Sequence, residues 1–282
     1  DDVDDSVPSA SSKNRRADAK TSSSRMSRRP RDAETTRVCR LGPLPALARR
    51  LGASQRDASS SFIIQMASSL PAWRAAVTSA LERNGANPTS RFVQVATIRA
   101  SDGAPAVRTV VFRGFWDDFV DDVGDAGRAH ALVFCADARS EKMRDVARDA
   151  RAEMAWYFPE TREQFRVSGT LTRATATATS VDEDSLESER ARVALWRRMR
   201  RGARGQALWP TPGGARAKAE SGTRDPHDVD ESDVRLNDDV AGEHFALVAM
   251  RATRVDHLRL KLNERVVYEE MEGAWTATRV NP

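Results

Sequence analysis

Short apolar runs that alternate with polar residues recur along residues 92–280, and they constrain the fold more than any other feature. Phe92 to Arg99 alternates as a β-strand does, and the turn Ser101-Asp-Gly-Ala-Pro105 leads into a second strand over Val107–Phe115. Six further strands are predicted in the same way: Ala131–Cys135, Glu153–Phe158, Glu163–Thr177, Phe245–Ala252, Arg265–Tyr268 and Trp275–Val280. Because strands outnumber helices and follow one another as hairpins, we expect a mainly β (α+β) fold, an antiparallel barrel with peripheral helices.

The helices are predicted at three places. The first begins near Pro71 and ends near Arg83, and the second covers Ser140–Ala150, with Met143, Val146 and Ala147 facing inward. The third begins at about residue 182 with acidic residues and ends near residue 201 with arginines, which complements the helix dipole. We therefore interpret these arginines as stabilising the helix. Residues 213–239 are polar and contain Gly and Pro, which predicts a mobile insertion.

Residues 1–66 are predicted to be a disordered tail, and residues 67–282 the folded domain. The tail is rich in Ser, Arg, Asp and Ala, so it buries too little apolar surface to offset the entropy lost on ordering. Between Met26 and Gln65 there are eight Arg, no Lys and three acidic residues, a composition typical of an organellar transit peptide. A transit peptide predicts the chloroplast or another organelle. A non-specific tail, or a translation start at Met66, predicts the cytoplasm.

The charge distribution argues against a nucleic-acid partner. The net charge of the chain is +4, but residues 1–65 alone carry 13 Lys/Arg and 8 Asp/Glu, which leaves the remainder at −1. The folded part therefore lacks the basic surplus of nucleic-acid-binding domains. No apolar run approaches the roughly 20 residues that span a bilayer, so we expect no membrane partner.

Cysteine, histidine and motif usage restrict the chemistry. The chain has two cysteines, Cys39 and Cys135, and Cys39 lies in the tail, so we expect no disulfide framework and a reducing compartment. The four histidines lack the spacing of metal ligands, so no metal is expected. A dinucleotide-binding glycine motif, a P-loop and a Gly-x-Ser-x-Gly nucleophile motif are absent from the sequence. Catalysis is therefore expected to depend on a bound cofactor.

Three segments place cations at the ends of apolar runs: Arg108-Thr-Val-Val-Phe-Arg113, Ala138-Arg-Ser-Glu-Lys142 and Arg162-Glu-Gln-Phe-Arg166. Charge-assisted hydrogen bonds to phosphate contribute about 1.5–3 kcal/mol each, and guanidinium groups suit phosphate oxygens. Arg108, Arg113, Lys142 and Arg166 are therefore candidates for a phosphate site; the alternative is that they are ordinary surface cations. Residues 108 and 113 face opposite sides of a regular strand, so we expect one of them beyond the strand end, at a bulge or at a subunit boundary.

Together these segments resemble the FMN-binding split-barrel family of pyridoxamine 5′-phosphate oxidase, from about Leu70 to Pro282. The segment 108–113 resembles the strand that lies along the flavin in that family, and Ser140-Glu-Lys142 resembles its phosphate-binding Ser-Arg-Lys. Gln164 matches a glutamine that contacts the flavin ring.

The C-terminal part carries the resemblance further. Arg265, Tyr268, Trp275 and the final Arg279-Val-Asn-Pro282 follow the family's closing pattern. Two other segments are similar to a plant and cyanobacterial branch of the family: Trp156-Tyr-Phe-Pro159 and Trp209-Pro-Thr-Pro-Gly213.

The resemblance implies an antiparallel split β-barrel that forms a homodimer and binds FMN at the subunit boundary. The implied cofactor-binding residues are Arg108, Thr109, Val110, Val111, Arg113, Ser140, Lys142, Gln164 and Arg265. Arg113, which is expected to reach both cofactor and substrate, and Lys261 are the implied catalytic residues. The implied activity is FMN-dependent oxidation of a small phosphorylated substrate, pyridoxine or pyridoxamine 5′-phosphate, to pyridoxal 5′-phosphate by dioxygen, within vitamin B6 metabolism.

Five departures from the family pattern leave the substrate open. Lys261 and Asn263 stand where the family binds its substrate with Arg-x-His, and Asn263 cannot act as an imidazole. Leu258 replaces a flavin-contacting tryptophan, Ala136 a threonine near the phosphate, and Glu141 the arginine of Ser-Arg-Lys. The alternatives are a flavin reductase, an oxidoreductase acting on another substrate, and a non-catalytic flavin-binding protein.

Overall fold

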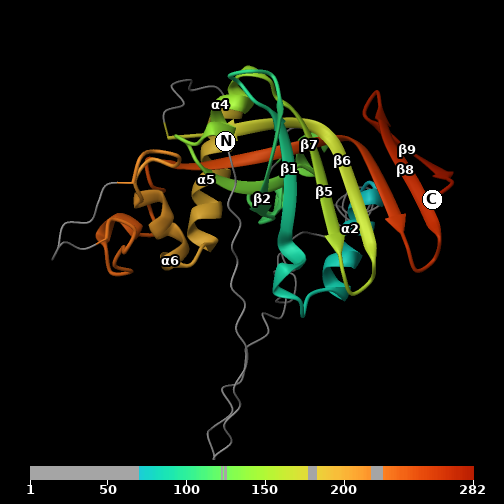
Figure 1. The fold of residues 1–282 in the computed structure, drawn as a ribbon, viewed down its shortest axis with the longest axis horizontal. Helices are drawn as coiled ribbons and strands as arrows, with labels where there is room; N and C mark the ends of the chain where they lie inside the picture. The colour runs from blue at the N-terminus through green and yellow to red at the C-terminus, as the bar shows by residue number, and fades with distance from the viewer. Residues whose placement is uncertain (1–69, 122, 124–125, 177–182, 217–224) are drawn as a thin grey trace, which may run out of the picture. The chain divides into compact units, whose positions relative to one another are not determined.

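A single antiparallel sheet organises the computed structural model, which describes residues 70–121, 123, 126–176, 183–216 and 225–282. Its strands run in the order β2-β1-β5-β6-β7-β4-β3, and β8 and β9 continue from β7 (Figure 1). The strands are β1 (Phe92–Ile98), β2 (Pro105–Val111), β3 (Gly114–Phe115), β4 (Leu132–Asp137), β5 (Arg151–Phe158), β6 (Glu163–Ala174), β7 (Phe245–Arg259), β8 (Glu264–Met271) and β9 (Ala274–Val280). All the pairings between these strands are antiparallel, as predicted.

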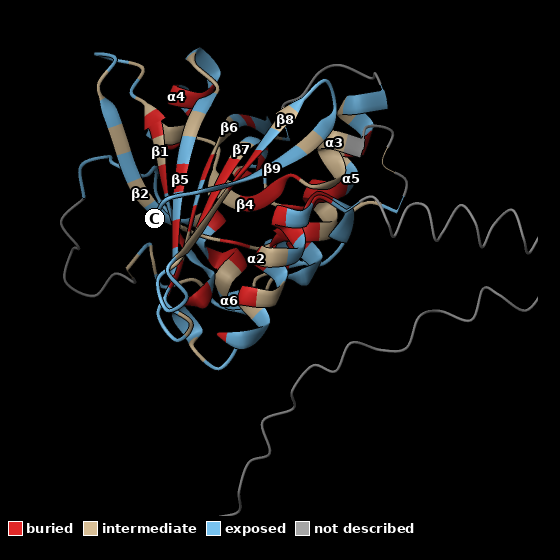
Figure 2. Ribbon diagram, turned by 90° about the vertical axis from the view of Figure 1, so that its right-hand side faces the viewer, coloured by how far each residue is buried: buried red, intermediate tan, exposed pale blue. Residues whose placement is uncertain are grey.

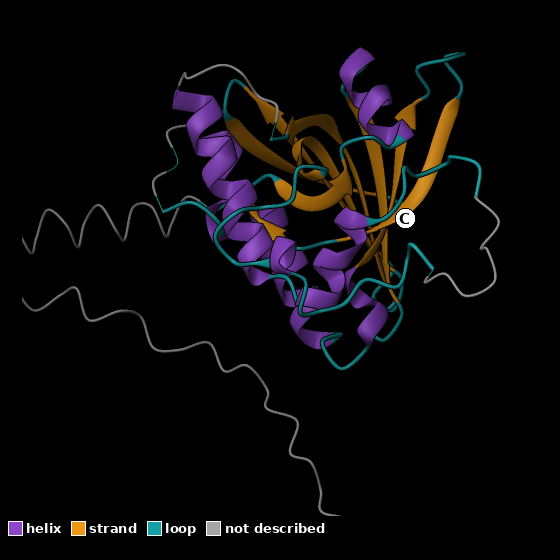
Figure 3. Ribbon diagram, turned by 90° about the vertical axis from the view of Figure 1, so that its left-hand side faces the viewer, coloured by secondary structure: helices purple, strands orange, loops and turns teal. Residues whose placement is uncertain are grey.

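The helices lie around this sheet (Figure 3). They are α2 (Ala72–Arg83), α3 (Ala126–Ala129), α4 (Glu141–Arg148), α5 (Glu183–Arg198) and α6 (Arg201–Arg204), with short 3-10 turns at Pro88–Arg91, Trp116–Asp118, Gly205–Leu208 and Val234–Leu236. In α4, Met143 and Val146 face inward as predicted, but Ala147 is exposed and Asp145 is buried in its place. The inward face of α4 is therefore partly charged.

Strand β7 is the central element of the sheet, and it is longer than predicted. The predicted strand ended at Ala252, whereas β7 continues to Arg259. β7 pairs with β6 along its length, while its first part pairs with β4 and its last part with β8. The β6–β7 register shifts between Ser168 and Gly169, and a Cβ atom on Gly169 would lie 2.0 Å from the carbonyl oxygen of Arg251. Only glycine fits here without backbone movement.

Two apolar cores lie on opposite faces of β7, because its side chains alternate. Most of β7 is therefore buried (Figure 2). Val248 and Met250 join the first core, which contains Trp156. Leu247 joins the second core, which contains Trp196 of α5. Burial on both faces explains why the first half of β7 is a continuous apolar run.

The segment 213–239, predicted to be a mobile insertion, is partly packed against the fold. Leu236 is fully buried in the second core, and Arg204 donates to its carbonyl oxygen. Residues 217–224 lie outside the described residues, as do the predicted tail and its proposed transit peptide. Within the described part of the chain, no helix is long and apolar enough to cross a membrane.

Candidate functional site

Arg108 and Lys142, two of the predicted phosphate ligands, lie next to each other. Arg108 on β2 is directly opposite the buried Val95 of β1, so its side chain is on the inner face of the sheet. Lys142 is in the first turn of α4, and both side chains line one small pocket together with Val110. Burial, followed by repulsion from Arg108, lowers the pKa of Lys142. The two cations are therefore close enough to disfavour each other in the absence of an anion.

The buried carboxylate of Asp145 fixes Arg108 but not Lys142. Arg108 donates to Asp145 at 3.2 Å and to the Thr97 hydroxyl at 2.7 Å. The Thr97 hydroxyl and the Ala100 N–H also donate to Asp145, both at 2.9 Å. Lys142 Nζ makes one hydrogen bond with the described residues, to Ser140 Oγ at 3.3 Å. The charge of Lys142 is thus available to an anionic ligand.

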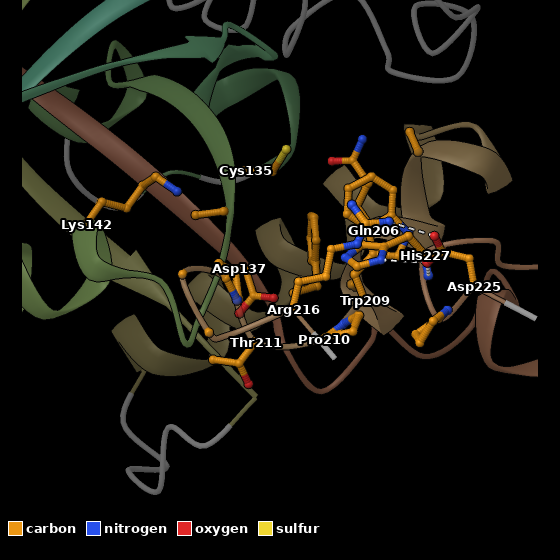
Figure 4. A pocket seen from close by; sticks show the side chains of 18 of the residues that line it. Cys135, Asp137, Lys142, Gln206, Trp209, Pro210, Thr211, Arg216, Asp225 and His227 are labelled. Atoms are coloured by element: carbon orange, nitrogen blue, oxygen red, sulfur yellow. Dashed lines mark hydrogen bonds and ion pairs between the residues drawn. The ribbon is translucent and has the colours of Figure 1, made fainter. Parts of the chain in front are cut away.

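A pocket of about 550 Å³ opens beside Lys142 (Figure 4). Its wall on the sheet side is the end of β4, from Cys135 to Asp137, and its other wall is the segment that contains Trp209. Arg139 joins the two walls, since it donates to Asp137 at 2.6 Å and to the Trp209 carbonyl oxygen at 2.8 Å. The volume lies within the range of about 300–1,000 Å³ that is typical of small-molecule sites.

Arg113 lies beyond the end of β2, which was one of the predicted explanations for the odd spacing of 108 and 113. Its backbone N–H donates to the Val133 carbonyl oxygen at 2.8 Å and so connects it to β4. The Arg113 Nε atom is buried and has no hydrogen-bond partner among the described residues. A buried donor without a partner costs about 1–3 kcal/mol, which favours a ligand contact at this position.

Arg166 and Arg265 form a second cation cluster, around the buried carboxylate of Asp256. Arg265 donates through two nitrogens to Asp256, at 2.9 and 2.7 Å, and Arg166 donates to the same carboxylate. Strand register places these side chains, with Gln164, on the face of the sheet opposite to Arg108. Within one chain, the predicted cofactor residues therefore form two groups on opposite faces of the sheet. Arg166 is not in the group that contains Arg108 and Lys142.

Asp256 makes the stability of the protein sensitive to acid. The Arg265 side chain donates to Asp256 and, with the Arg166 bond, lowers its pKa to about 2 although burial raises it. An unfolded aspartate has a pKa of about 3.9, so the ion pairs stabilise the fold above about pH 4 and are lost as the pH falls towards about 2. We expect the wild type to be more stable than Asp256→Asn by about 1–2 kcal/mol at neutral pH. Urea unfolding should show this difference shrinking between pH 4 and 2; a difference that stays constant with pH would contradict the assignment.

The residues expected at the substrate lie in the turn between β7 and β8. Lys261 is exposed and donates to the Glu160 carbonyl oxygen at 2.7 Å, and Asn263 has a φ of 56°. Neither residue lines the pocket beside Lys142. Among the described residues, no group of His, Cys, Asp and Glu side chains is arranged to hold a metal ion.

Several residues of the site were not identified from the sequence. The carboxylates of Asp145 and Asp256 each lie far along the chain from at least one arginine that they bind, so no local pattern indicates them. Trp209 belongs to the segment that resembles a plant and cyanobacterial branch of the family, whereas no sequence pattern indicates His227, which also lines the pocket. The arrangement fits the phosphate and ring of FMN, because Lys142 lacks a carboxylate partner among the described residues and the adjoining pocket is large enough for a small molecule.

Comparisons with known proteins agree on one family. Residues 70–175 match the model of the pyridoxamine 5′-phosphate oxidase FMN-binding domain. Pyridoxine/pyridoxamine 5′-phosphate oxidase 2 of Arabidopsis thaliana is 29% identical over 215 residues, which cover 74% of this chain and 96% of that protein. The crystal structure of a pyridoxamine 5′-phosphate oxidase-related, FMN-binding protein from Nostoc punctiforme PCC 73102 is 34% identical with a TM-score of 0.63, and the match covers 76% of this chain and 100% of the other.

Proposed function

Because this chain belongs to the pyridoxamine 5′-phosphate oxidase-related family of FMN-binding split-barrel proteins, we propose that it oxidises pyridoxine or pyridoxamine 5′-phosphate to pyridoxal 5′-phosphate. Its cofactor is FMN, and it is an FMN-dependent oxidoreductase. The name of the Arabidopsis relative supports the choice of substrate. The observation that carries the proposal is the half-buried Lys142, which lies beside Arg108 at a pocket of about 550 Å³.

The residues of this chain have separate parts in the proposed reaction. Lys142 and Arg108 hold the FMN phosphate, and Asp145 keeps the Arg108 guanidinium in place. Arg113, with its buried Nε, contacts both cofactor and substrate. Bound FMN supplies a hydride acceptor that dioxygen reoxidises, with release of hydrogen peroxide. The protein contributes binding, orientation and positive charge near the ring.

Production of hydrogen peroxide tests this function directly. The purified FMN-loaded protein should release one hydrogen peroxide for each pyridoxal 5′-phosphate formed from pyridoxine 5′-phosphate, and pyridoxine without the phosphate should react far more slowly. Peroxide-coupled fluorescence and the absorbance of the aldehyde product measure the two yields. A protein that binds FMN but turns over neither pyridoxine nor pyridoxamine 5′-phosphate would instead support an oxidoreductase for another substrate, the alternative that Asn263 and Leu258 leave open.

We propose that the active form is a homodimer in which each FMN contacts both chains. The division of the predicted cofactor residues between the two faces of the sheet supports this, because a partner chain supplies the missing group. An exposed apolar surface on the Arg166 face supports it too: it contains Phe92 on β1, Val107 on β2 and Tyr157 on β5, with exposed fractions of 44%, 70% and 45%. Exposed apolar surface of this kind is typical of a protein interface.

A charge placed in this surface should separate the subunits. We expect Val107→Asp to shift the protein from dimer to monomer in light scattering after size-exclusion chromatography, because an unpaired carboxylate would be buried at the interface. Val240→Asp is the matched control, since Val240 is 65% exposed and lies outside this surface. A Val107→Asp protein that remains dimeric would place the interface elsewhere.

We propose an organellar location, from the tail composition and from the plant relative. Residues 1–69 fused to a fluorescent protein should direct it to chloroplasts or another organelle in plant cells. Uniform cytoplasmic fluorescence would reject this assignment.

A further inference from the structure

The pocket beside Lys142 has a second, aromatic end, formed by residues that the proposed reaction does not use. Trp209, Arg216, Asp225 and His227 lie at this end, and Lys142 lies at the other (Figure 4). Apolar residues of the adjoining helical segment, Ala203 and Ala207 among them, complete the wall, and Pro210 lies beside Trp209. The pocket therefore joins a cationic end to an aromatic end.

Asp225 fixes the orientation of the His227 ring. Its Oδ1 atom accepts from the His227 backbone N–H at 2.9 Å and lies 2.8 Å from the ring Nδ1. These bonds from His227, with a smaller effect of Arg216, lower the pKa of Asp225 to about 2, so its carboxylate only accepts. Nδ1 must then carry a hydrogen, and Nε2 is the free ring nitrogen. Nε2 makes no hydrogen bond with any residue that the structure describes.

The Trp209 ring supports the imidazole from the side. The two rings meet edge to face, with centroids 5.4 Å apart and an interplanar angle of 66°. Trp209 is 36% exposed, so part of its ring remains open to the pocket. Aromatic groups in such contacts favour a further planar ring as a neighbour.

The charges around the pocket specify a ligand that is charged at one end only. Its charged side chains are Asp137, Lys142, Arg216, Asp225 and His227 when protonated. Asp137 pairs with Arg139 at 2.6 Å, and Arg216 pairs with Asp225 at 2.7 Å. Lys142 is the cation left without a carboxylate partner among the described residues that line the pocket. An anionic group thus fits the Lys142 end, and an uncharged ring fits the Trp209 end.

We propose that Trp209 and His227 bind the planar nitrogen heterocycle of a ligand whose phosphate lies at Lys142, with Nε2 of His227 accepting a hydrogen bond from the ring. FMN, through its ring N–H, and a vitamin B6 phosphate, through its ring hydroxyl, share this chemistry; the second of these ligands rests on the proposed function. His227 is then a binding residue, and Asp225 is a positioning residue that acts through it.

Two binding measurements test the inference in the full-length protein. One is FMN binding to the apoprotein, followed by flavin fluorescence, and the other is binding of pyridoxal 5′-phosphate to the same FMN-free protein, followed by equilibrium dialysis. His227→Phe keeps a ring beside Trp209 but removes Nε2, and it should raise one of the two Kd values about tenfold. His244→Phe, at a histidine that is not among the described residues lining this pocket, should change both by less than twofold.

The ligand whose Kd rises in His227→Phe identifies the bound heterocycle as that of FMN or that of the substrate. Asp225→Asn should weaken the same ligand about threefold, and should have no further effect in a His227→Phe background, because Asp225 acts through His227. If His227→Phe proves unstable in thermal unfolding, the single variant Asp225→Asn decides the matter: a threefold weaker binding of one ligand supports the inference, and two unchanged Kd values overturn it. Two unchanged Kd values in a folded His227→Phe protein, or additive effects of the two substitutions, would overturn the inference. If the wild type produces no peroxide from pyridoxine 5′-phosphate while His227→Phe weakens FMN, the proposed function fails and this inference stands.

Discussion

Lys142→Glu is expected to raise the Kd for FMN at least 100-fold. The substitution removes the half-buried ammonium group that lies next to Arg108 and places a carboxylate at the same position. A phosphate monoester carries about −1.5 to −2 charges at neutral pH, so attraction becomes repulsion. The loss of one charge-assisted hydrogen bond alone removes about 1.5–3 kcal/mol, and the repulsion adds to it. Titration of the apoprotein, followed by flavin fluorescence at constant ionic strength, measures the change.

Arg144→Glu provides the matched control for this prediction. Arg144 lies two residues further along α4, its side chain is 64% exposed, and it contacts Glu141 at 3.7 Å. The net charge changes equally in both variants, so a general electrostatic effect would weaken FMN binding in both. We expect less than a threefold change for Arg144→Glu because exposed charges are screened. Equal effects of the two substitutions would show that Lys142 does not contact the phosphate.

Gly169→Ala is expected to lower the free energy of unfolding by about 3 kcal/mol or more. The added methyl group would lie 2.0 Å from the Arg251 carbonyl oxygen and 3.1 Å from the Ala252 Cα atom. Both obstacles are backbone atoms of β7, so no side-chain rotation relieves the clash, and β6 and β7 must separate at the register shift. Thermal unfolding should show a midpoint lowered by about 10 °C.

A glycine-to-alanine substitution at Gly205 should raise the free energy of unfolding instead of lowering it. Gly205 has a φ of −51° and a ψ of −29°, which alanine adopts readily, and an added Cβ would lie 3.4 Å from the nearest atom, the Val229 Cβ. Gly205→Ala is therefore expected to stabilise the fold by about 0.4–1 kcal/mol, since it reduces the freedom of the unfolded chain. If both variants unfold at the wild-type temperature, the backbones of β6 and β7 at Gly169 lie further apart than in the structure, with room for a methyl group beside the Arg251 carbonyl oxygen.

The fold was predictable where its signals are local. Hairpins such as β1–β2 combine alternating residues with a turn sequence, and both lie within a short window. β7 was predicted too short because the residues after Ala252 include Arg254 and Asp256, which interrupt the apolar run. These residues belong in a strand because their partners lie on neighbouring strands, as Arg166 and Arg265 do for Asp256. Such pairings depend on tertiary structure that a sequence window does not contain.

The cations of the site could be predicted from the sequence, but the residues that hold them in place could not. Arg108 and Lys142 were selected by residue type and position, and the structure brings them together. The carboxylate that holds Arg108 was missed because only apolar residues were assigned to the inner face of α4, where Asp145 lies. His227 was missed for a different reason: it reaches Trp209 across a segment without periodic pattern.

The late position of β7 in the sequence affects how the nascent chain folds on the ribosome. β4 and β6 are synthesised long before residues 245–259, yet each pairs with that strand along its whole length. Until it emerges, the nascent chain exposes two open strand edges next to unassembled apolar surface, a state prone to aggregation. The sheet therefore cannot be completed before β7 is synthesised, and chains that end before Phe245 should depend on chaperones for their solubility.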